Sequence, residues 1–391
     1  GLRVLLYNSR DFITNSILVL VRSGTDYENK NNNGISHFLE HLFFKGTKNF
    51  PTPEKLGFEL DKIGAEYNAF TSYEYTGYYI KTLPEYFERA IFLMSDLLIN
   101  PIFNEKEIEK EKNVIIEEIN YHKDNPLSFI FDETLKLCYG DQPAGWSILG
   151  NEGNIKKFSS KVIRDYFKKR YSIKNSLIVI TGNFEKSKAI KFLEKYFKNY
   201  PGSKVIIKTK FKEVKGFRGK IFYKKDASQA HLVFLFRVPG LLKLKERRYA
   251  ISLLSTILGA GMSSRLFKAI REELGLSYYI RVNFDSYTNR GYIFIQSGAK
   301  LDKTSLVVEK ILEEIYKIKR EKIDKEEFDK GLAILKNTLF ASLESSLNLA
   351  YFIGMDYFLL NKIPSIEEVL NKLKKLKIED LYNTANQYFK K

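Results

Sequence analysis

Two of the four histidines in this chain lie four residues apart, in the run Ser36-His37-Phe38-Leu39-Glu40-His41-Leu42. On a helix, positions i and i+4 lie one above the other, so His37 and His41 can bind one metal ion. A ligand set of two imidazoles and one carboxylate favours zinc, and a catalytic zinc keeps one position open for water. Glu40, one turn on from His37, is suited to be the general base that takes the proton of this water. The ordinary alternative is a pair of surface histidines that bind nothing.

A third ligand is expected from a separate helix, and the segment Glu105–Tyr121 is the best supplier. Glu111 and Glu118 are seven residues apart and share a helical face with Ile115, whereas a solvated helix places its acids opposite its apolar residues. Glu117 fits the solvated pattern. Spacing alone does not distinguish Glu118 from Glu117, but the helical face favours Glu118 as the ligand. Glu111 is then interpreted as a carboxylate that supports the site from behind.

The elements that must position these residues occur twice along the chain. In the first half a strand at 17–21 leads to the histidine helix, a further helix and a β-hairpin, and then to more helices and a last strand at 177–181. In the second half a strand at 231–237 leads to helices at 246–258 and 264–273, a hairpin at 278–297 and four more helices. The order of elements matches, which indicates an internal repeat.

This pattern predicts an α+β fold of two homologous domains. Each domain is expected to be a largely antiparallel sheet packed with helices, and the two are expected to surround a peptide-binding cleft or chamber. The predicted bounds are an N-terminal zinc-binding domain at 1–203, a Lys-rich linker at 204–219 and a C-terminal domain at 220–391. A length of 391 residues suits two domains of ordinary size.

Composition excludes several other classes. The 44% of apolar and 28% of charged residues are typical of a globular chain, and no apolar run approaches the roughly 20 residues that span a bilayer. The one cysteine, Cys138, excludes an internal disulfide and a thiolate cluster. The net charge of +17 raises nucleic-acid binding as an alternative, but the lysines are spread along the whole chain. We therefore expect no nucleic-acid partner and no membrane association. We expect a cytoplasmic location, with periplasmic or organellar locations as alternatives.

The chain resembles the family of pitrilysin, insulin-degrading enzyme and the mitochondrial processing peptidase, in its short two-domain branch. The H-x-x-E-H spacing is the known signature of inverted zincins. The resemblance covers most of the chain through GISHFLEHLFFKGTKNFP, EKNVIIEEI, NAFTSYEYTGYY, SILGNEGNI, QAHLVFLF and GMSSRLFKAIREELGLSYYI. It implies one zinc ion held by His37, His41 and Glu118, with Glu111 as an auxiliary glutamate.

The resemblance also implies roles in substrate binding. Asn68, Ala69 and Phe70 would lie on an edge strand to which the substrate backbone adds as a β-strand, and Phe44 would line the subsite beside the scissile bond. The second half has no histidine pair. It instead carries Arg271 and Tyr278, which by resemblance hold substrate carbonyls and the tetrahedral intermediate. The alternative, which the resemblance makes the weaker one, is that they simply pack at a helix-to-strand turn. His231, in a predicted strand, is interpreted as structural.

The expected function is that of a zinc-dependent endopeptidase acting on unfolded or short peptides. The alternative is a non-catalytic or heterodimer-partner subunit that serves as a peptide-binding scaffold. Because one chain carries both the zinc residues and the Arg–Tyr pair, a homodimer is expected, and a heterodimer remains the alternative. Ser128 and Asp132 stand where the mitochondrial enzymes carry two acids that select arginine, so only one of these two acids is retained and the resemblance gives no firm expectation of that specificity.

Overall fold

The computed structural model describes residues 1–202, 204–216, 218–225 and 227–390. Four residues lie outside the described part. Residues 203 and 391 are predicted domain bounds, residue 217 falls in the predicted linker, and residue 226 falls in the predicted C-terminal domain. Contacts divide the chain into two units, which are described separately. The first contains 1–124, 141–212 and 342–363, and the second contains 125–140, 213–341 and 364–391.

A five-stranded sheet forms the centre of the first unit. Its strands are β1 (Arg3–Asn8), β2 (Asn15–Val21), β3 (Glu66–Thr71), β4 (Thr76–Thr82) and β5 (Ser176–Gly182). They follow the order β1-β5-β2-β4-β3, so β3 lies at one edge. Only the β1–β5 pair is parallel, and the other pairs are antiparallel. The sheet is therefore largely antiparallel, as the sequence predicts.

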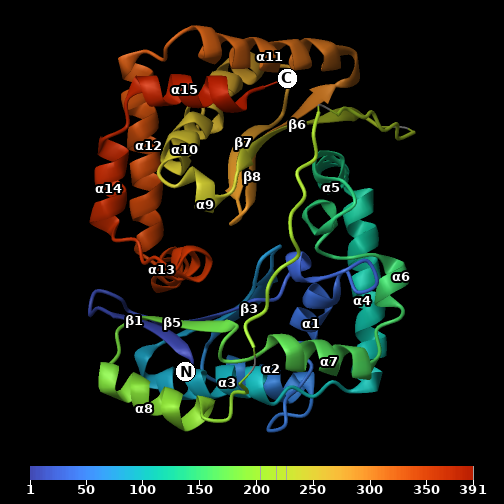
Figure 1. Ribbon diagram of the computed structural model, residues 1–391, viewed down its shortest axis with the longest axis vertical. Helices are drawn as coiled ribbons and strands as arrows, with labels where there is room; N and C mark the ends of the chain where they lie inside the picture. Colours follow the sequence, from blue (N-terminus) through green and yellow to red (C-terminus); the bar gives the residue numbers. More distant parts are fainter. Residues whose placement is uncertain (203, 217, 226, 391) are drawn as a thin grey trace. The chain divides into compact units, whose positions relative to one another are not determined.

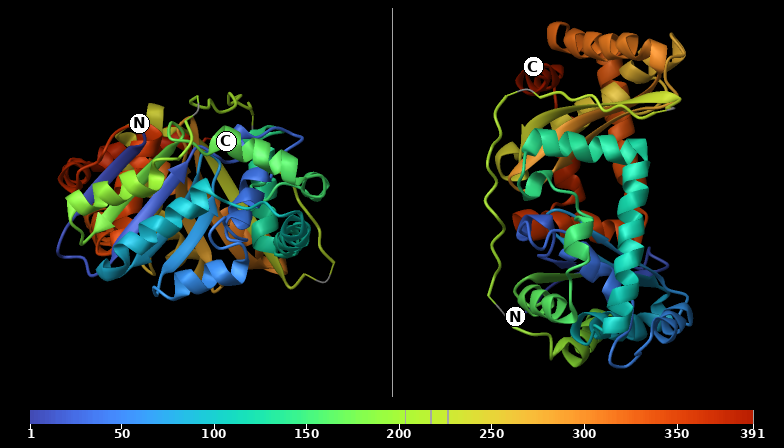
Figure 2. Two further views of the ribbon diagram at one scale, coloured as in Figure 1. Left: turned by 90° about the horizontal axis from the view of Figure 1, so that it is seen from below. Right: turned by 90° about the vertical axis from the view of Figure 1, so that its right-hand side faces the viewer.

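Helices cover both faces of this sheet (Figure 1). On one face α3 packs on β2 and β4 and also contacts α8, and on the other α13 packs on β2 and β5. The helical segments of the first unit are η1 (Thr25–Tyr27), α1 (Ile35–Phe43), α2 (Pro53–Asp61), η2 (Pro84–Tyr86), α3 (Phe87–Ile99), α4 (Glu105–Asp124), η3 (Pro143–Gly145), α6 (Glu152–Ile155), α7 (Ser160–Arg170), α8 (Lys186–Phe197) and α13 (Ser346–Leu360). The right-hand view of Figure 2 shows α4 as one uninterrupted helix.

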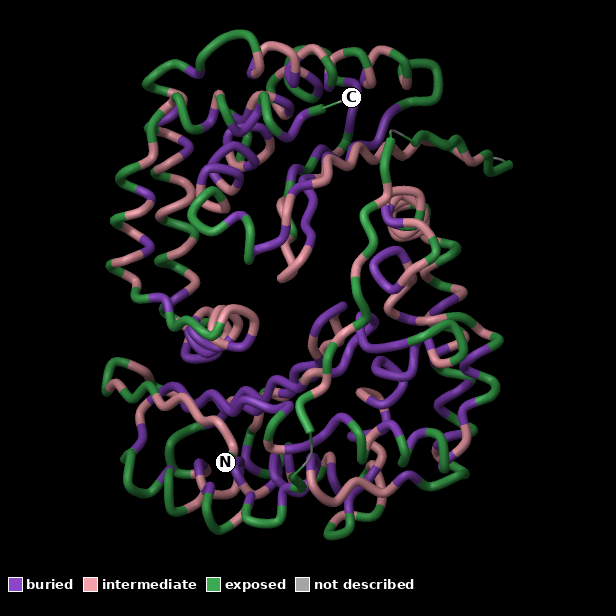
Figure 3. Tube along the Cα trace, in the orientation of Figure 1, coloured by how far each residue is buried: buried purple, intermediate pink, exposed green. Residues whose placement is uncertain are grey.

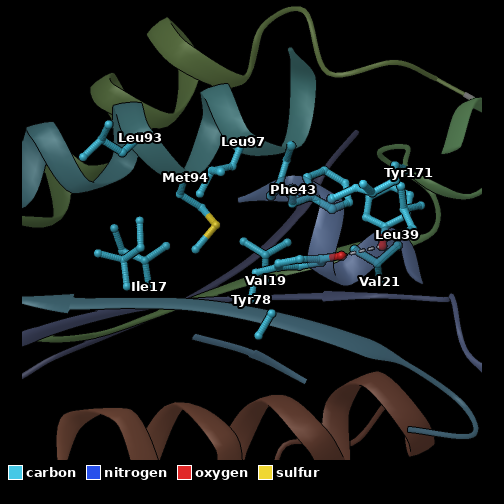
Figure 4. Close-up of a cluster of buried hydrophobic side chains, with 14 of the residues drawn as sticks. Ile17, Val19, Val21, Leu39, Phe43, Tyr78, Leu93, Met94, Leu97 and Tyr171 are labelled. Atoms are coloured by element: carbon cyan, nitrogen blue, oxygen red, sulfur yellow. Dashed lines mark hydrogen bonds between the residues drawn. The ribbon is translucent and has the colours of Figure 1, made fainter. Parts of the chain in front are cut away.

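The core of the first unit lies between the sheet and the helices α1 and α3. Because side chains alternate along a strand, Ile17, Val19 and Val21 of β2 point to the same face, where they meet these helices (Figure 4). Tyr78 of β4 reaches into the same layer and shares a hydrogen bond of 2.7 Å with the hydroxyl of Tyr171. Figure 3 shows that the central strands and most of α1 are buried, so the helix that carries the histidines rests on a rigid layer.

The second unit is built on an antiparallel sheet with the order β6-β8-β7. Its strands are β6 (Gln229–Pro239), β7 (Ile280–Ser286) and β8 (Arg290–Lys300). Its helical segments are α5 (Pro126–Tyr139), α9 (Leu241–Leu244), α10 (Arg247–Gly259), the π-helix η4 (Phe267–Glu272), η5 (Leu301–Lys303), α11 (Thr304–Arg320), α12 (Lys325–Leu343), α14 (Ile366–Lys374) and α15 (Ile378–Tyr388). The predicted α+β fold class is confirmed for the described part of the chain.

Each unit includes one helix from the other half of the sequence. Helix α5 packs on β6, and the backbone oxygen of Leu127 accepts a hydrogen bond of 3.2 Å from Gln296. Helix α13 packs on the first sheet, where Ser346 and Ser16 share a hydrogen bond of 2.8 Å between their hydroxyl groups. The compact units therefore do not follow the contiguous bounds that we predict for two homologous domains.

Among the described residues, no helix is both long enough and apolar enough to span a membrane.

Candidate metal centre

Helix α1 is held to the core by one side and presents its histidines on the other. Phe38, Leu39 and Leu42 are almost fully buried, so the apolar side of α1 is fixed against the first unit. The i, i+4 spacing then places the two imidazoles next to each other, with 4.6 Å between the ring centroids of His37 and His41. The predicted pairing of these rings on one helical face is thus present in the structure.

Helix α4 brings a carboxylate to this pair. Oε2 of Glu118 lies 3.7 Å from Nε2 of His37 and 3.7 Å from Nε2 of His41. One potential ligand atom from each of the three residues lies within 4.8 Å of the others. Around a tetrahedral zinc, ligand atoms are about 3.3 Å apart, since metal–ligand distances are about 2.0–2.1 Å. Small side-chain shifts would therefore be enough for this donor set to hold a zinc ion.

The protonation of His37 suits a metal ligand. Burial, followed by the charges of His41 and His122, lowers the pKa of His37 to about 3. The ring is therefore neutral near pH 7, and its Nε2 lone pair is free to bind a cation. His122, one helical turn on from Glu118, is the residue through which α4 adds to this effect. Its position was not singled out from the sequence, although the i, i+4 spacing from Glu118 would have indicated it.

Glu111 orients the other histidine. Burial lowers the pKa of His41, but the hydrogen bond and the charge of Glu111, together with the charges of Glu40 and Glu118, outweigh burial and raise that pKa. Oε1 of Glu111 lies 2.8 Å from Nδ1 of His41, and its Oε2 lies 2.7 Å from the ammonium of Lys45. When Nδ1 donates to Glu111, Nε2 is left free to face Glu118. The sequence does not predict a role for Lys45 at this site, because no pattern indicates that its side chain reaches toward α4.

Glu111 is expected to support metal binding without touching the metal. We expect a Glu111→Gln variant to bind zinc about 10-fold to 100-fold more weakly, because the charge that orients His41 is lost. The affinity is measured by competition with a chromogenic chelator. The matched control is Glu109→Gln on the same helix, where the carboxylate is 59% exposed and pairs with Lys112. Equal zinc affinity in Glu111→Gln and the wild type would contradict this role.

Glu40 lies on α1 and is held by the edge strand. Its Oε2 accepts a hydrogen bond of 2.5 Å from the hydroxyl of Thr71 on β3. Burial raises the pKa of Glu40, and the hydrogen bond from Thr71 opposes this rise. A carboxylate with a raised pKa is a stronger base than an exposed one, which suits the predicted role. Thr71 was not singled out from the sequence, although strand alternation from Ala69 indicates that it faces the same side.

The four residues predicted to contact substrate lie on β3 or beside it. Asn68 is exposed, and Ala69 is buried on the face of the sheet that carries Thr71. Phe44 follows the end of α1, and its ring lies 5.8 Å from the ring of Tyr67 on β3. Phe70 points to the opposite face, where its ring lies 5.4 Å from that of Tyr351 on α13. One edge of β3 pairs with β4, and no described strand pairs with its other edge.

The predicted Arg–Tyr pair belongs to the second unit. The guanidinium of Arg271 lies over the ring of Phe267 at 4.9 Å, and Tyr278 is 82% exposed. Their contact with substrate stays a prediction. Ser128 and Asp132 lie on α5 of the same unit. Nδ1 of His231, on β6, lies 2.9 Å from the hydroxyl of Tyr279, as expected for a structural histidine.

Comparisons with known proteins identify the family of this chain. Residues 3–152 match the model of the insulinase family, peptidase family M16, and residues 157–335 match that of the peptidase M16 inactive domain. A relative from Rickettsia felis described as an uncharacterized zinc protease is 34% identical over 100% of this chain and 93% of its own length. The chain belongs to peptidase family M16. The match to the inactive-domain model falls mainly on the half whose helix α10 contains no histidine.

Further M16 relatives match over the same extent. A protein from Bacillus subtilis, also described as an uncharacterized zinc protease, is 34% identical over 100% of this chain and 94% of its own. The solved structure of a protease from Helicobacter pylori has a TM-score of 0.94 at 25% identity, and covers 100% of this chain and 94% of that one. A Pseudomonas fluorescens structure, described as a peptidase M16 inactive domain, has a TM-score of 0.91 at 18% identity. The match covers 100% of this chain and 93% of that one. This last likeness shows the fold alone.

Proposed function

We propose that this M16 chain is a zinc-dependent endopeptidase that hydrolyses unfolded or short peptides. The observation that carries the proposal is the convergence of His37, His41 and Glu118 from two helices, with ligand atoms within 4.8 Å of one another. The neutral state of His37 and the contact between Glu111 and His41 support the same donor set. Relatives described as zinc proteases support it independently.

The chain's own residues supply the acid–base chemistry. When bound, zinc would act as a Lewis acid that polarises the scissile carbonyl and lowers the pKa of water. Glu40 accepts the proton of the attacking water and then donates it to the leaving amine, while Thr71 holds its carboxylate in place. Glu111 keeps the ring of His41 oriented through both transfers.

The edge of β3 binds the peptide substrate in this proposal. Its outer edge, with which no described strand pairs, can pair with an extended peptide, which adds to the sheet as a further strand. Because Ala69 and Thr71 share one face of β3, alternate substrate side chains would point toward Glu40 and Phe44. A folded protein cannot offer an extended segment of this kind, which is why unfolded peptides are the expected substrates. Homodimer formation and the roles of Arg271 and Tyr278 remain predictions.

Metal removal tests the proposal directly. The purified wild-type chain should contain about one zinc per chain by plasma mass spectrometry and should cleave quenched fluorescent peptides. Dialysis against a chelator should abolish cleavage, and addition of stoichiometric zinc should restore it, because Glu40 alone is too weak a catalyst. The control is dialysis without chelator.

The competing function is a non-catalytic peptide-binding scaffold. The observation that favours it is the match of residues 157–335 to the family model of the peptidase M16 inactive domain. Against it, this chain retains the histidine pair, Glu118 and Glu40 in one place. A wild-type protein that contains no zinc, and cleaves no peptide after zinc is added back, would favour the scaffold and end the peptidase proposal.

A further inference from the structure

A buried carboxylate outside the metal centre holds the first turn of the histidine helix. Glu28 follows η1, is only 3% exposed and lies six residues before Gly34. Its Oε2 accepts hydrogen bonds from the backbone N–H of Gly34 at 2.9 Å and from the side-chain amide of Asn33 at 3.0 Å. Its Oε1 accepts one from the backbone N–H of Ser36 at 2.9 Å. The residue after Ser36 is His37.

Helix α1 needs a cap of this kind because it cannot carry an ordinary one. The first backbone N–H groups of a helix have no partner within the helix, and a Ser, Thr, Asp or Asn side chain at the N-cap usually satisfies one of them. The N-cap residue here is Gly34, with φ of 97°, a conformation that other residues rarely adopt. A Cβ at this position would lie 2.8 Å from the Cα of Gly150. The capping group therefore has to come from another part of the chain.

The same turn is held from a second side. The amide of Asn33 also donates to the backbone oxygen of Ser147 at 3.1 Å, and Asn154 donates to the backbone oxygen of Asn33 at 3.2 Å. The hydroxyls of Ser36 and Tyr166 share a hydrogen bond of 2.7 Å. Because α1 has only nine residues, tertiary contacts of this kind, rather than its own propensity, determine its position.

We propose that Glu28 is a positioning residue that caps α1 from outside and so sets the angle at which His37 and His41 meet Glu118. This inference rests on the proposed zinc site. Three donors converge on the carboxylate, and its negative charge also lies at the positive end of the helix. A glutamine of the same size offers one acceptor oxygen and brings an NH₂ group toward N–H donors. It therefore loses the hydrogen bonds that one of the two oxygens accepts, while leaving the volume filled.

The test compares zinc affinity and thermal stability in two buried carboxylates of the same unit. Asp96 is 1% exposed and also accepts three hydrogen bonds, from Thr47, Asn49 and Asn100, but it has no hydrogen bond to α1. Full-length wild type, Glu28→Gln and Asp96→Asn are melted without metal, and zinc affinity is measured by competition with a chromogenic chelator. Both variants should melt earlier than wild type. Of the two variants, only Glu28→Gln should bind zinc more weakly, by about tenfold. This is the lower end of the loss in affinity seen when a residue that supports a metal ligand is removed.

The outcomes separate this inference from the proposed function. Wild type that binds no zinc rejects the proposed zinc site itself. If wild type binds zinc and Glu28→Gln binds zinc equally well, the positioning role is overturned. The same conclusion follows if Glu28→Gln loses no more zinc affinity than Asp96→Asn does. If Glu28→Gln does not fold, Glu28→Asp takes its place, because it keeps the charge but is one methylene too short to reach both Gly34 and Ser36. The same comparison then decides, with a loss in zinc affinity expected for Glu28→Asp alone.

Discussion

Replacing Glu40 by glutamine should lower kcat for peptide cleavage about 10²-fold to 10⁴-fold, the range typical of a lost general base. Glutamine keeps the shape of the side chain and can still accept the hydrogen bond from Thr71. It cannot accept the proton of the attacking water. Zinc content should remain about one per chain, because the donor atoms that converge belong to His37, His41 and Glu118.

The measurement combines zinc content by plasma mass spectrometry with steady-state cleavage of a quenched peptide. Zinc content separates loss of the base from loss of the metal, which would also stop cleavage. The matched control is Glu117→Gln, which changes an exposed acid of α4 to the same amide. A Glu40→Gln protein that holds zinc and turns over substrate at the wild-type rate would remove Glu40 from the mechanism.

Replacing Glu118 by glutamine should remove both zinc and activity. Its Oε2 lies 3.7 Å from Nε2 of each histidine, and a neutral amide oxygen is a much weaker zinc ligand than a carboxylate. We expect zinc affinity to fall by more than about 100-fold. A loss of about 100-fold is the upper end of the range for losing a residue that only hydrogen-bonds to a zinc ligand, and losing a ligand itself should weaken binding further. Zinc affinity is measured by chelator competition, and cleavage is measured on the same samples.

The neighbouring position provides a sharp control for this prediction. Glu117 is one residue away on the same helix but exposed, so Glu117→Gln should bind zinc and cleave peptide as the wild type does. The sequence spacing left these two glutamates open as alternatives, and the pair of variants compares them directly. Loss of zinc in Glu117→Gln with retention in Glu118→Gln would exchange their roles.

Local periodicity was sufficient for much of the candidate site. The i, i+4 spacing places His37 and His41 side by side because a helix turns every 3.6 residues. The i, i+7 spacing places Glu111 and Glu118 on one face of α4 for the same reason, and the structure brings both toward the histidines. The β3–β4 hairpin also follows from the alternation of its residues, within one or two residues at each end.

Contacts between distant parts of the chain were decided only by the tertiary structure. The parallel pairing of β1 with β5 and the packing of α13 on the first sheet join residues more than 150 positions apart. Periodicity carries no information on which distant surface an apolar face will cover. The predicted contiguous domain bounds therefore could not show that α5 and α13 each pack with the other half of the sequence.

The sequence by itself thus determined which residue types could meet at the metal centre, since each local spacing fixes a direction on its own helix or strand. The support for those residues was decided in three dimensions. Lys45 behind Glu111, Thr71 on Glu40 and Glu28 on the first turn of α1 are single polar side chains without a repeating pattern. Their partners became identifiable only once packing had brought separate elements together, because a hydrogen bond depends on distance and direction rather than on sequence spacing.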